Sequence, residues 1–101
     1  MVSRSKQNHK KKGFLEVFNI DENYLKLLYE KQNGKCYWSE MVLSINNVGL
    51  GELDTISIDR LDCTVGYIQG NIVLCSKFMN LGRGNYPADK FKEFLKTILN
   101  K

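Results

Sequence analysis

The chain has 101 residues, of which 43% are hydrophobic, and its formal net charge is +4. This length and composition indicate one small globular domain with a modest core, which excludes a disordered chain. The sequence contains no apolar run of about 18 residues, so we expect no membrane span. The N-terminal residues also lack the apolar segment of a secretory signal, and we therefore expect an intracellular protein.

The positive charge is concentrated in residues 1–13, which carry no acid and five basic residues: Arg4, Lys6, Lys10, Lys11 and Lys12. The rest of the chain has ten Lys or Arg and eleven Asp or Glu, a net charge of −1. We expect residues 1–13 to form a basic flexible tail, disordered or extended. Its lysines at positions 10, 11 and 12 are candidates for phosphate contacts, although a merely solubilising tail is the alternative. His9 is interpreted as a bystander.

The cysteine pattern argues against cross-links and against a structural metal. The chain has three cysteines, Cys36, Cys63 and Cys75, and no Cys-x-x-Cys pair. An odd number does not support a disulfide framework, and a structural zinc ion needs four ligands that are mostly cysteine or histidine. We therefore predict small buried thiols and no structural zinc.

The first half of the chain predicts one helix followed by a turn and a loop. Asp21 is a suitable N-cap for a helix that runs to about Asn33. Leu25, Leu28 and Tyr29 have the spacing of one apolar helix face, and Gly34 can end the helix in a left-handed conformation. A turn over 36–43 comes next. Residues 44–54 are rich in Asn and Gly, which is typical of a loop.

The second half predicts two strands and two helices. Residues 55–58 and 72–74 read as short strands on either side of a turn. Ser76 can cap a short helix over 77–81, which the segment 82–84 ends. Pro87 suits the first turn of a last helix. The apolar stripe of that helix consists of Phe91, Phe94, Leu95, Ile98 and Leu99.

A polar motif follows the first strand, where Asp59, Arg60 and Asp62 stand close together. Side chains alternate along a strand, so Asp59 points away from Arg60. On its own, this motif is better explained by a surface Asp–Arg ion pair at a turn.

Further motifs place the polar segment in a longer pattern. Ser57 to Asp62 is followed by Gly66-Tyr67, by Gly70-Asn71-Ile72 and by a cysteine and a helical Asn80, with Gly34-x-Cys36 upstream. This order and spacing resemble an HNH-type (ββα-metal) endonuclease branch with an Asp-Arg motif, related in layout to phage recombination endonuclease VII. The resemblance covers residues 34–85, about half of the chain.

The resemblance implies a role for each matching residue. Asp59 and Asn80 would hold a divalent cation, and Asn71 would brace the loop between the strands. A carboxylate and an amide oxygen suit a hard cation such as Mg²⁺ or Mn²⁺. That cation would stabilise charge during phosphodiester cleavage.

The sequence departs from this family at the position of its general-base histidine, which is Arg60 here. Arginine stays protonated and cannot act as an ordinary base, but it could hold the phosphate. Three outcomes stay open: Asp62 or another group accepts the proton, metal-bound water attacks slowly, or the domain only binds. In zinc-containing relatives, cysteines occupy the places of Ser39 and Ser76.

Together these observations predict an α+β fold. A small ββα core at about 55–84 would lie between N- and C-terminal helices in a single domain of residues 14–101. The expected function is metal-dependent DNA cleavage, with an inactive nucleic-acid- or protein-binding module as the alternative. Lys77 and Arg83 flank Asn80 and are further candidates for DNA contacts. We expect duplex or branched DNA as partner, a homodimer as one route to specificity, and a phage or virus as the source.

Overall fold

The computed structural model describes residues 1–45 and 52–99. Over these residues the chain forms four helices and one two-stranded antiparallel sheet. Their order is α1 (Val2–Lys11), α2 (Glu22–Lys31), β1 (Ile56–Arg60), β2 (Ile72–Ser76), α3 (Lys77–Arg83) and α4 (Ala88–Leu99). The predicted small α+β fold, with a ββα core and helices on either side, is confirmed.

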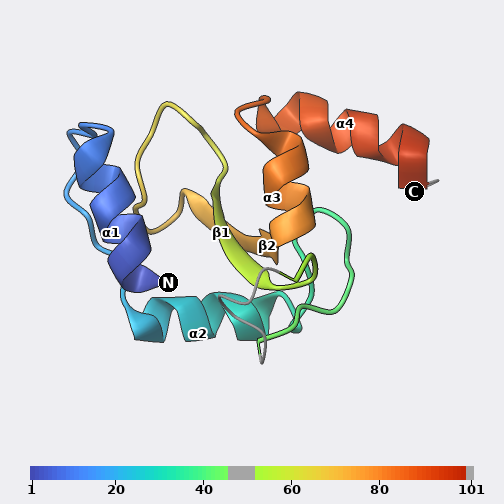
Figure 1. The fold of residues 1–101 in the computed structure, drawn as a ribbon, viewed down its shortest axis with the longest axis horizontal. Helices are drawn as coiled ribbons and strands as arrows, with labels where there is room; N and C mark the ends of the chain where they lie inside the picture. Colours follow the sequence, from blue (N-terminus) through green and yellow to red (C-terminus); the bar gives the residue numbers. More distant parts are fainter. Residues whose placement is uncertain (46–51, 100–101) are drawn as a thin grey trace.

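The two strands form a hairpin whose two faces carry different residues. Asp59 lies opposite Val73 in the register, and Ile58 lies opposite Leu74. Since side chains alternate along a strand, Ser57 and Asp59 share one face. Helix α3 covers this face, and α1 lies on the other side of β1 (Figure 1).

Helix α3 begins where β2 ends. The hydroxyl of Ser76 accepts a hydrogen bond from the backbone N–H of Met79 at 3.2 Å, so Ser76 caps the helix as predicted. The helix ends at Gly84, whose φ of 55° lies in the left-handed region that glycine tolerates. This direct connection holds α3 against both strands and fixes the side chains of its inner face.

Helix α2 is tied to β2 by a side chain at its C-terminal end. The Asp21 carboxylate accepts a hydrogen bond from the N–H of Tyr24 at 2.8 Å, which confirms the predicted cap. At the other end, Gln32 donates to the carbonyl of Leu74 at 2.8 Å and accepts from its N–H at 3.0 Å. The side-chain amide of Gln32 thereby pairs with the backbone of β2 in the way that a neighbouring strand would.

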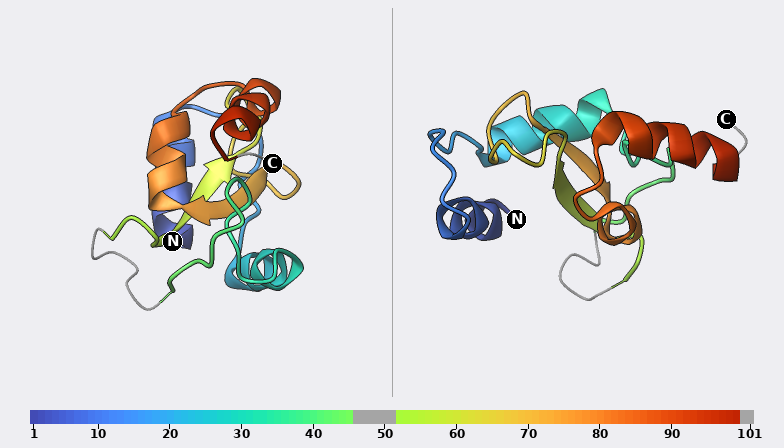
Figure 2. Two further views of the ribbon diagram at one scale, coloured as in Figure 1. Left: turned by 90° about the vertical axis from the view of Figure 1, so that its right-hand side faces the viewer. Right: turned by 90° about the horizontal axis from the view of Figure 1, so that it is seen from above.

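Helix α4 packs through only part of its predicted apolar stripe. Phe91 and Leu95 are buried, and the ring of Phe91 meets Trp38 edge-on with centroids 5.1 Å apart. Phe94 and Ile98 are instead exposed, so these two positions do not belong to the core of this chain. Helix α4 lies at the opposite end of the molecule from α1 (Figure 2).

The N-terminal segment differs from the prediction, because it forms helix α1 rather than a flexible tail. His9 is buried, not a bystander. Its Nδ1 accepts a hydrogen bond from the N–H of Tyr67 at 3.0 Å, and its Nε2 lies 2.6 Å from the carbonyl of Glu16. The geometry fits the neutral tautomer with the proton on Nε2.

The basic residues in the last turn of α1 also suit the negative end of its helix dipole.

The predicted loop over 44–54 lies partly outside the described residues, because 46–51 belong to the part of the chain that the structure does not describe. Within the described ranges, no helix combines the length and apolar character needed to cross a membrane.

Candidate functional site

Asp59 is the acid that the sequence predicts as a metal ligand, and it lies on the β1 face under α3. The residue is buried at 5% exposure. One carboxylate oxygen, Oδ2, accepts hydrogen bonds from Trp38 Nε1 at 2.8 Å and from Arg83 Nη1 at 2.9 Å. The carboxylate is therefore paired with a cation of the chain itself.

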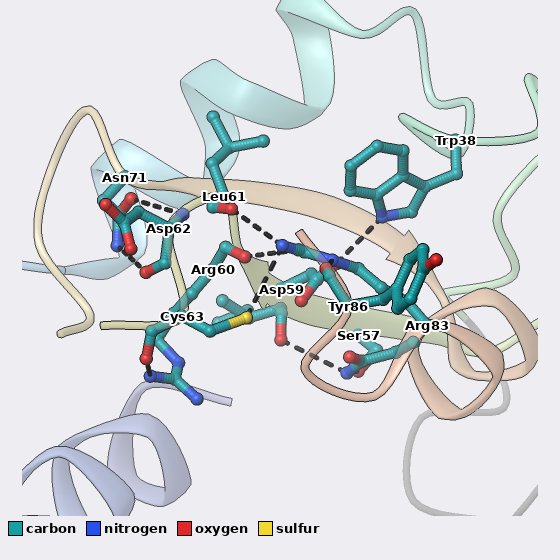
Figure 3. A network of polar contacts seen from close by, with 12 residues as sticks. Trp38, Ser57, Asp59, Arg60, Leu61, Asp62, Cys63, Asn71, Arg83 and Tyr86 are labelled. Carbon is teal, nitrogen blue, oxygen red and sulfur yellow. Dashed lines mark hydrogen bonds and ion pairs between the residues drawn. The ribbon is translucent and has the colours of Figure 1, made fainter. Parts of the chain in front are cut away.

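The guanidinium of Arg83 is enclosed at the junction of the hairpin and α3 (Figure 3). Besides Asp59 it donates to four acceptors, which are the carbonyls of Arg60, Leu61 and Tyr86 and the sulfur of Cys63. A guanidinium has five N–H donors, so each of them has an acceptor here. Arg83 is 3% exposed, and its donors already have acceptors, so this structure leaves none of them free for the phosphate contact that the sequence predicted.

This arrangement does not fit a divalent cation on Asp59. A doubly charged ion on the same carboxylate would lie within a few ångströms of the guanidinium. Two unit charges 4 Å apart interact by about 4 kcal/mol at an effective dielectric constant of 20, and a double charge makes the repulsion about 8 kcal/mol. Such an ion would have to bind against this repulsion, on a carboxylate whose Oδ2 already accepts two hydrogen bonds.

Arg60 contacts the loop after β1 and the segment before α2 rather than Asp59. Its side chain is buried on the other face of β1, where Nη1 donates to the carbonyl of Cys63 at 2.7 Å. The guanidinium also lies over the rings of Phe14 and Tyr67, at 4.9 and 5.2 Å from their centroids. Arg60 therefore holds the loop after β1 and the segment before α2, and its predicted phosphate contact stays a prediction.

Asn71 braces the loop between the strands, as the sequence predicted. Its Oδ1 accepts from the N–H of Asp62 at 2.9 Å, and its Nδ2 donates to the carbonyls of Asp62, Val65 and Gly66 at 3.1, 3.2 and 2.9 Å. One side chain thus connects both ends of the loop from Leu61 to Gly70. Nothing in this geometry requires Asn71 to act in catalysis.

Asp62 is exposed at the start of the same loop. Hydrogen bonds from the hydroxyl and then the backbone N–H of Thr64 lower the pKa of its carboxylate. A carboxylate with a lowered pKa is a weaker base, so the environment of Asp62 disfavours the proton-accepting role predicted for it.

Asn80, the second predicted metal ligand, points toward β1. Its Nδ2 donates to the hydroxyl of Ser57 at 2.7 Å and to the carbonyl of Ile58 at 3.3 Å. The amide therefore attaches α3 to the strand. Asn80 also borders a surface groove with its neighbours Lys77 and Leu81.

The three cysteines are free thiols, of which two are buried. Cys36 Sγ accepts from the N–H of Ser76 at 3.3 Å and lies 3.9 Å from its hydroxyl. Burial raises the pKa of Cys75. Among residues 1–45 and 52–99, no three His, Cys, Asp or Glu side chains gather as a metal would require. The expected absence of structural zinc stays a prediction.

A groove of about 830 Å³ lies between α1 on one side and β1 with α3 on the other. Arg4 from α1 and Lys77 from α3 supply a cation from each wall, and no Asp or Glu is among the described residues that line it. The other polar lining residues are Ser3, Ser5, Gln7, Asn8, Thr55, Ser57, Tyr67 and Asn80. The groove is therefore positive and rich in hydrogen-bonding groups.

The predicted phosphate contacts on residues 10–12 lie at the C-terminal end of α1 and are all exposed. Lys11 is seven residues after Arg4, so the two lie on the same helix face. Lys10 is exposed away from this face, and Lys12 is the C-cap. Lys11 thus continues the helix face that carries Arg4, beyond the residues that line the groove.

Sequence reasoning missed Arg4, His9 and Trp38 as contributors to this region. Arg4 was counted only as part of the basic tail. The spacing of Val2, Ser5 and His9 fits one helix face, but the small and polar side chains give it little apolar signal. Trp38 carries an indole N–H, which needs an acceptor when buried and could have indicated a carboxylate nearby.

Comparison with known proteins gives one informative similarity. No family model matches the chain. The chain is 32% identical over 76 residues to an uncharacterized 29.0 kDa protein in the dda-modA intergenic region of Enterobacteria phage T4. The similar region is 75% of this chain but 28% of the phage protein. The chain thus corresponds to less than a third of that relative.

Proposed function

We propose that this chain is a nucleic-acid-binding module built on a ββα unit, and that it holds the phosphate backbone without cutting it. The observation that carries the proposal is the groove with Arg4 and Lys77 on its walls and no acid among its described lining residues. Cations that neutralise phosphates release counterions, which favours binding at low salt. Serine hydroxyls and side-chain amides supply further phosphate and sugar contacts.

The same proposal accounts for the polar residues of β1. Asp59 is paired with Arg83, and Arg60 donates to loop carbonyls, which supports binding over cleavage. On this proposal, the chain shares the architecture of HNH-like nucleases but uses it for binding. DNA, duplex or branched, is the expected ligand, and similarity to a phage protein agrees with a viral source and action inside an infected cell.

Fluorescence anisotropy with labelled duplex, branched and single-stranded DNA tests the binding. We expect Arg4→Gln and Lys77→Gln each to weaken binding and to reduce the slope of log K against log salt by about 1. Lys90→Gln is the matched control, because Lys90 is an exposed basic residue that belongs to α4 and does not line the groove. Equal losses in all three variants, or no binding at low salt, would contradict the proposal.

A plasmid-nicking assay tests the absence of cleavage. We expect no nicking by the purified chain in Mg²⁺, Mn²⁺ or EDTA. Nicking that requires a divalent metal and disappears in Asp59→Ala would replace the proposal with the endonuclease reading. Binding of the wild type to the same plasmid serves as the control that the protein in the assay is folded and able to bind.

A further inference from the structure

The atoms around Arg83 include oxygen atoms of the kind that bind a hard cation. Its guanidinium meets one carboxylate oxygen, from Asp59, and three backbone carbonyl oxygens, from Arg60, Leu61 and Tyr86. Carboxylates and backbone carbonyls are the oxygen ligands that Ca²⁺ uses in proteins. The arginine therefore fills an oxygen-lined pocket that converges on one positive charge.

We propose that Arg83 is a tethered counter-ion, which does the structural work of a bound divalent cation at the junction of the hairpin and α3. Two consequences are part of the proposal. The wild-type chain folds and keeps its shape without divalent metal. Shortening Arg83 exposes the oxygen atoms around it and creates a divalent-cation site where none exists in the natural chain.

The contacts of Arg83 join segments that are separate along the chain. They connect the end of β1, the loop residue Cys63 and the segment between α3 and α4 at Tyr86. The ring of Trp38 covers the guanidinium from a fourth segment, at 5.1 Å from the ring centroid. A single charge that gathers four segments is the arrangement by which structural metals stabilise small domains.

Burial distinguishes this pair from an ordinary surface ion pair. The side chain of Arg83 is 0% exposed and that of Asp59 is 6% exposed. Removing one partner of such a pair leaves an uncompensated charge in the interior. A small hydrated cation can supply that missing charge, and the freed carbonyls can bind it. If Arg83 only connected two elements, no cation would be expected to replace its charge.

Thermal unfolding of wild type, Arg83→Ala and the double variant Arg83→Ala with Asp59→Asn tests the proposal. Each protein is measured in EDTA, Ca²⁺ and Mn²⁺ by circular dichroism. We expect the wild-type midpoint to be the same in all three. Arg83→Ala should unfold at lower temperature in EDTA and recover part of the loss with Ca²⁺ or Mn²⁺. The double variant should show no recovery, because Asp59 supplies the one carboxylate that Arg83 contacts among residues 1–45 and 52–99.

Mn²⁺ binding to the wild type, followed by electron paramagnetic resonance, keeps the proposal testable if Arg83→Ala does not fold. We expect the wild type to show no signal of bound Mn²⁺ that is lost in the Asp59→Asn variant. Such a signal would overturn the proposal, and so would an Arg83→Ala protein that no cation stabilises or refolds. None of these readouts involves nucleic acid, so failure here is distinguishable from failure of the proposed function.

Discussion

Replacing Gly66 with alanine should separate α1 from the ββα unit. A Cβ added at Gly66 would lie 2.3 Å from Cε1 and 2.4 Å from Nδ1 of the His9 ring. Carbon atoms prefer a separation of about 3.5–4 Å, so the ring would have to move by about 1 Å or more. That movement breaks the bond from the Tyr67 N–H to Nδ1 and weakens the bond between Nε2 and Glu16.

The cost follows from these contacts. Two hydrogen bonds contribute about 1 kcal/mol each, and overpacking adds about 1–3 kcal/mol. Because the ring can relax by moving outward with α1, we expect Gly66→Ala to lower the free energy of unfolding by about 2–4 kcal/mol.

Urea unfolding and amide hydrogen exchange measure this effect. Gly82→Ala is the matched control, because a Cβ at Gly82 meets no atom within 4 Å and the residue lies inside α3. We expect that control to be neutral or more stable by up to about 1 kcal/mol, since alanine favours a helix. The Tyr67 amide should lose protection only in Gly66→Ala. Equal stabilities of the two variants would refute the docking of α1 through His9.

Three further predictions follow from single side chains. Asn71→Ala should lower stability by about 2–4 kcal/mol in urea unfolding, because one side chain makes four hydrogen bonds to the loop; a loss below about 1 kcal/mol would argue against the brace. Asp21→Ala should cost about 1 kcal/mol through loss of the α2 cap, measured by the same assay. An NMR titration should place the Asp62 pKa below the ordinary aspartate value of about 3.9, and Thr64→Val should raise it.

The sign of the Asp62 effect on stability follows from the direction of its pKa shift. Thr64 lowers the folded-state pKa, so the unfolded chain takes up the proton first as the pH falls. The contribution of this carboxylate is therefore present above its unfolded pKa and is lost as the pH falls through the folded one. The carboxylate is fully exposed, which makes the contribution small.

Local signals account for most of the secondary structure that the sequence predicts. Asp21 and Ser76 cap α2 and α3 because a short side-chain oxygen satisfies a free N–H at a helix start. The two strands follow from runs of β-branched and apolar residues. Each of these signals involves residues only a few positions apart, and so they can be recognised without knowing how the chain folds back on itself.

The site could not be predicted in the same way, because its partners are distant along the chain. Asp59 and Arg83 are 24 residues apart, and whether they meet depends on the angle of α3 over β1. One clue was present, since Asn80 and Arg83 are one helical turn apart and share a face. If that face carries Asn80 toward β1, then it carries Arg83 there as well.

The attachment of α1 has a consequence for how the chain matures. His9 contacts Tyr67, a residue 58 positions later. At about 5–20 residues per second, synthesis takes roughly 3–12 s to add that stretch. During this interval the helix has been made but has no surface to dock on. The groove therefore forms only after the hairpin and α3 have been made, and a prematurely terminated chain that lacks them would emerge with a basic helix and no groove.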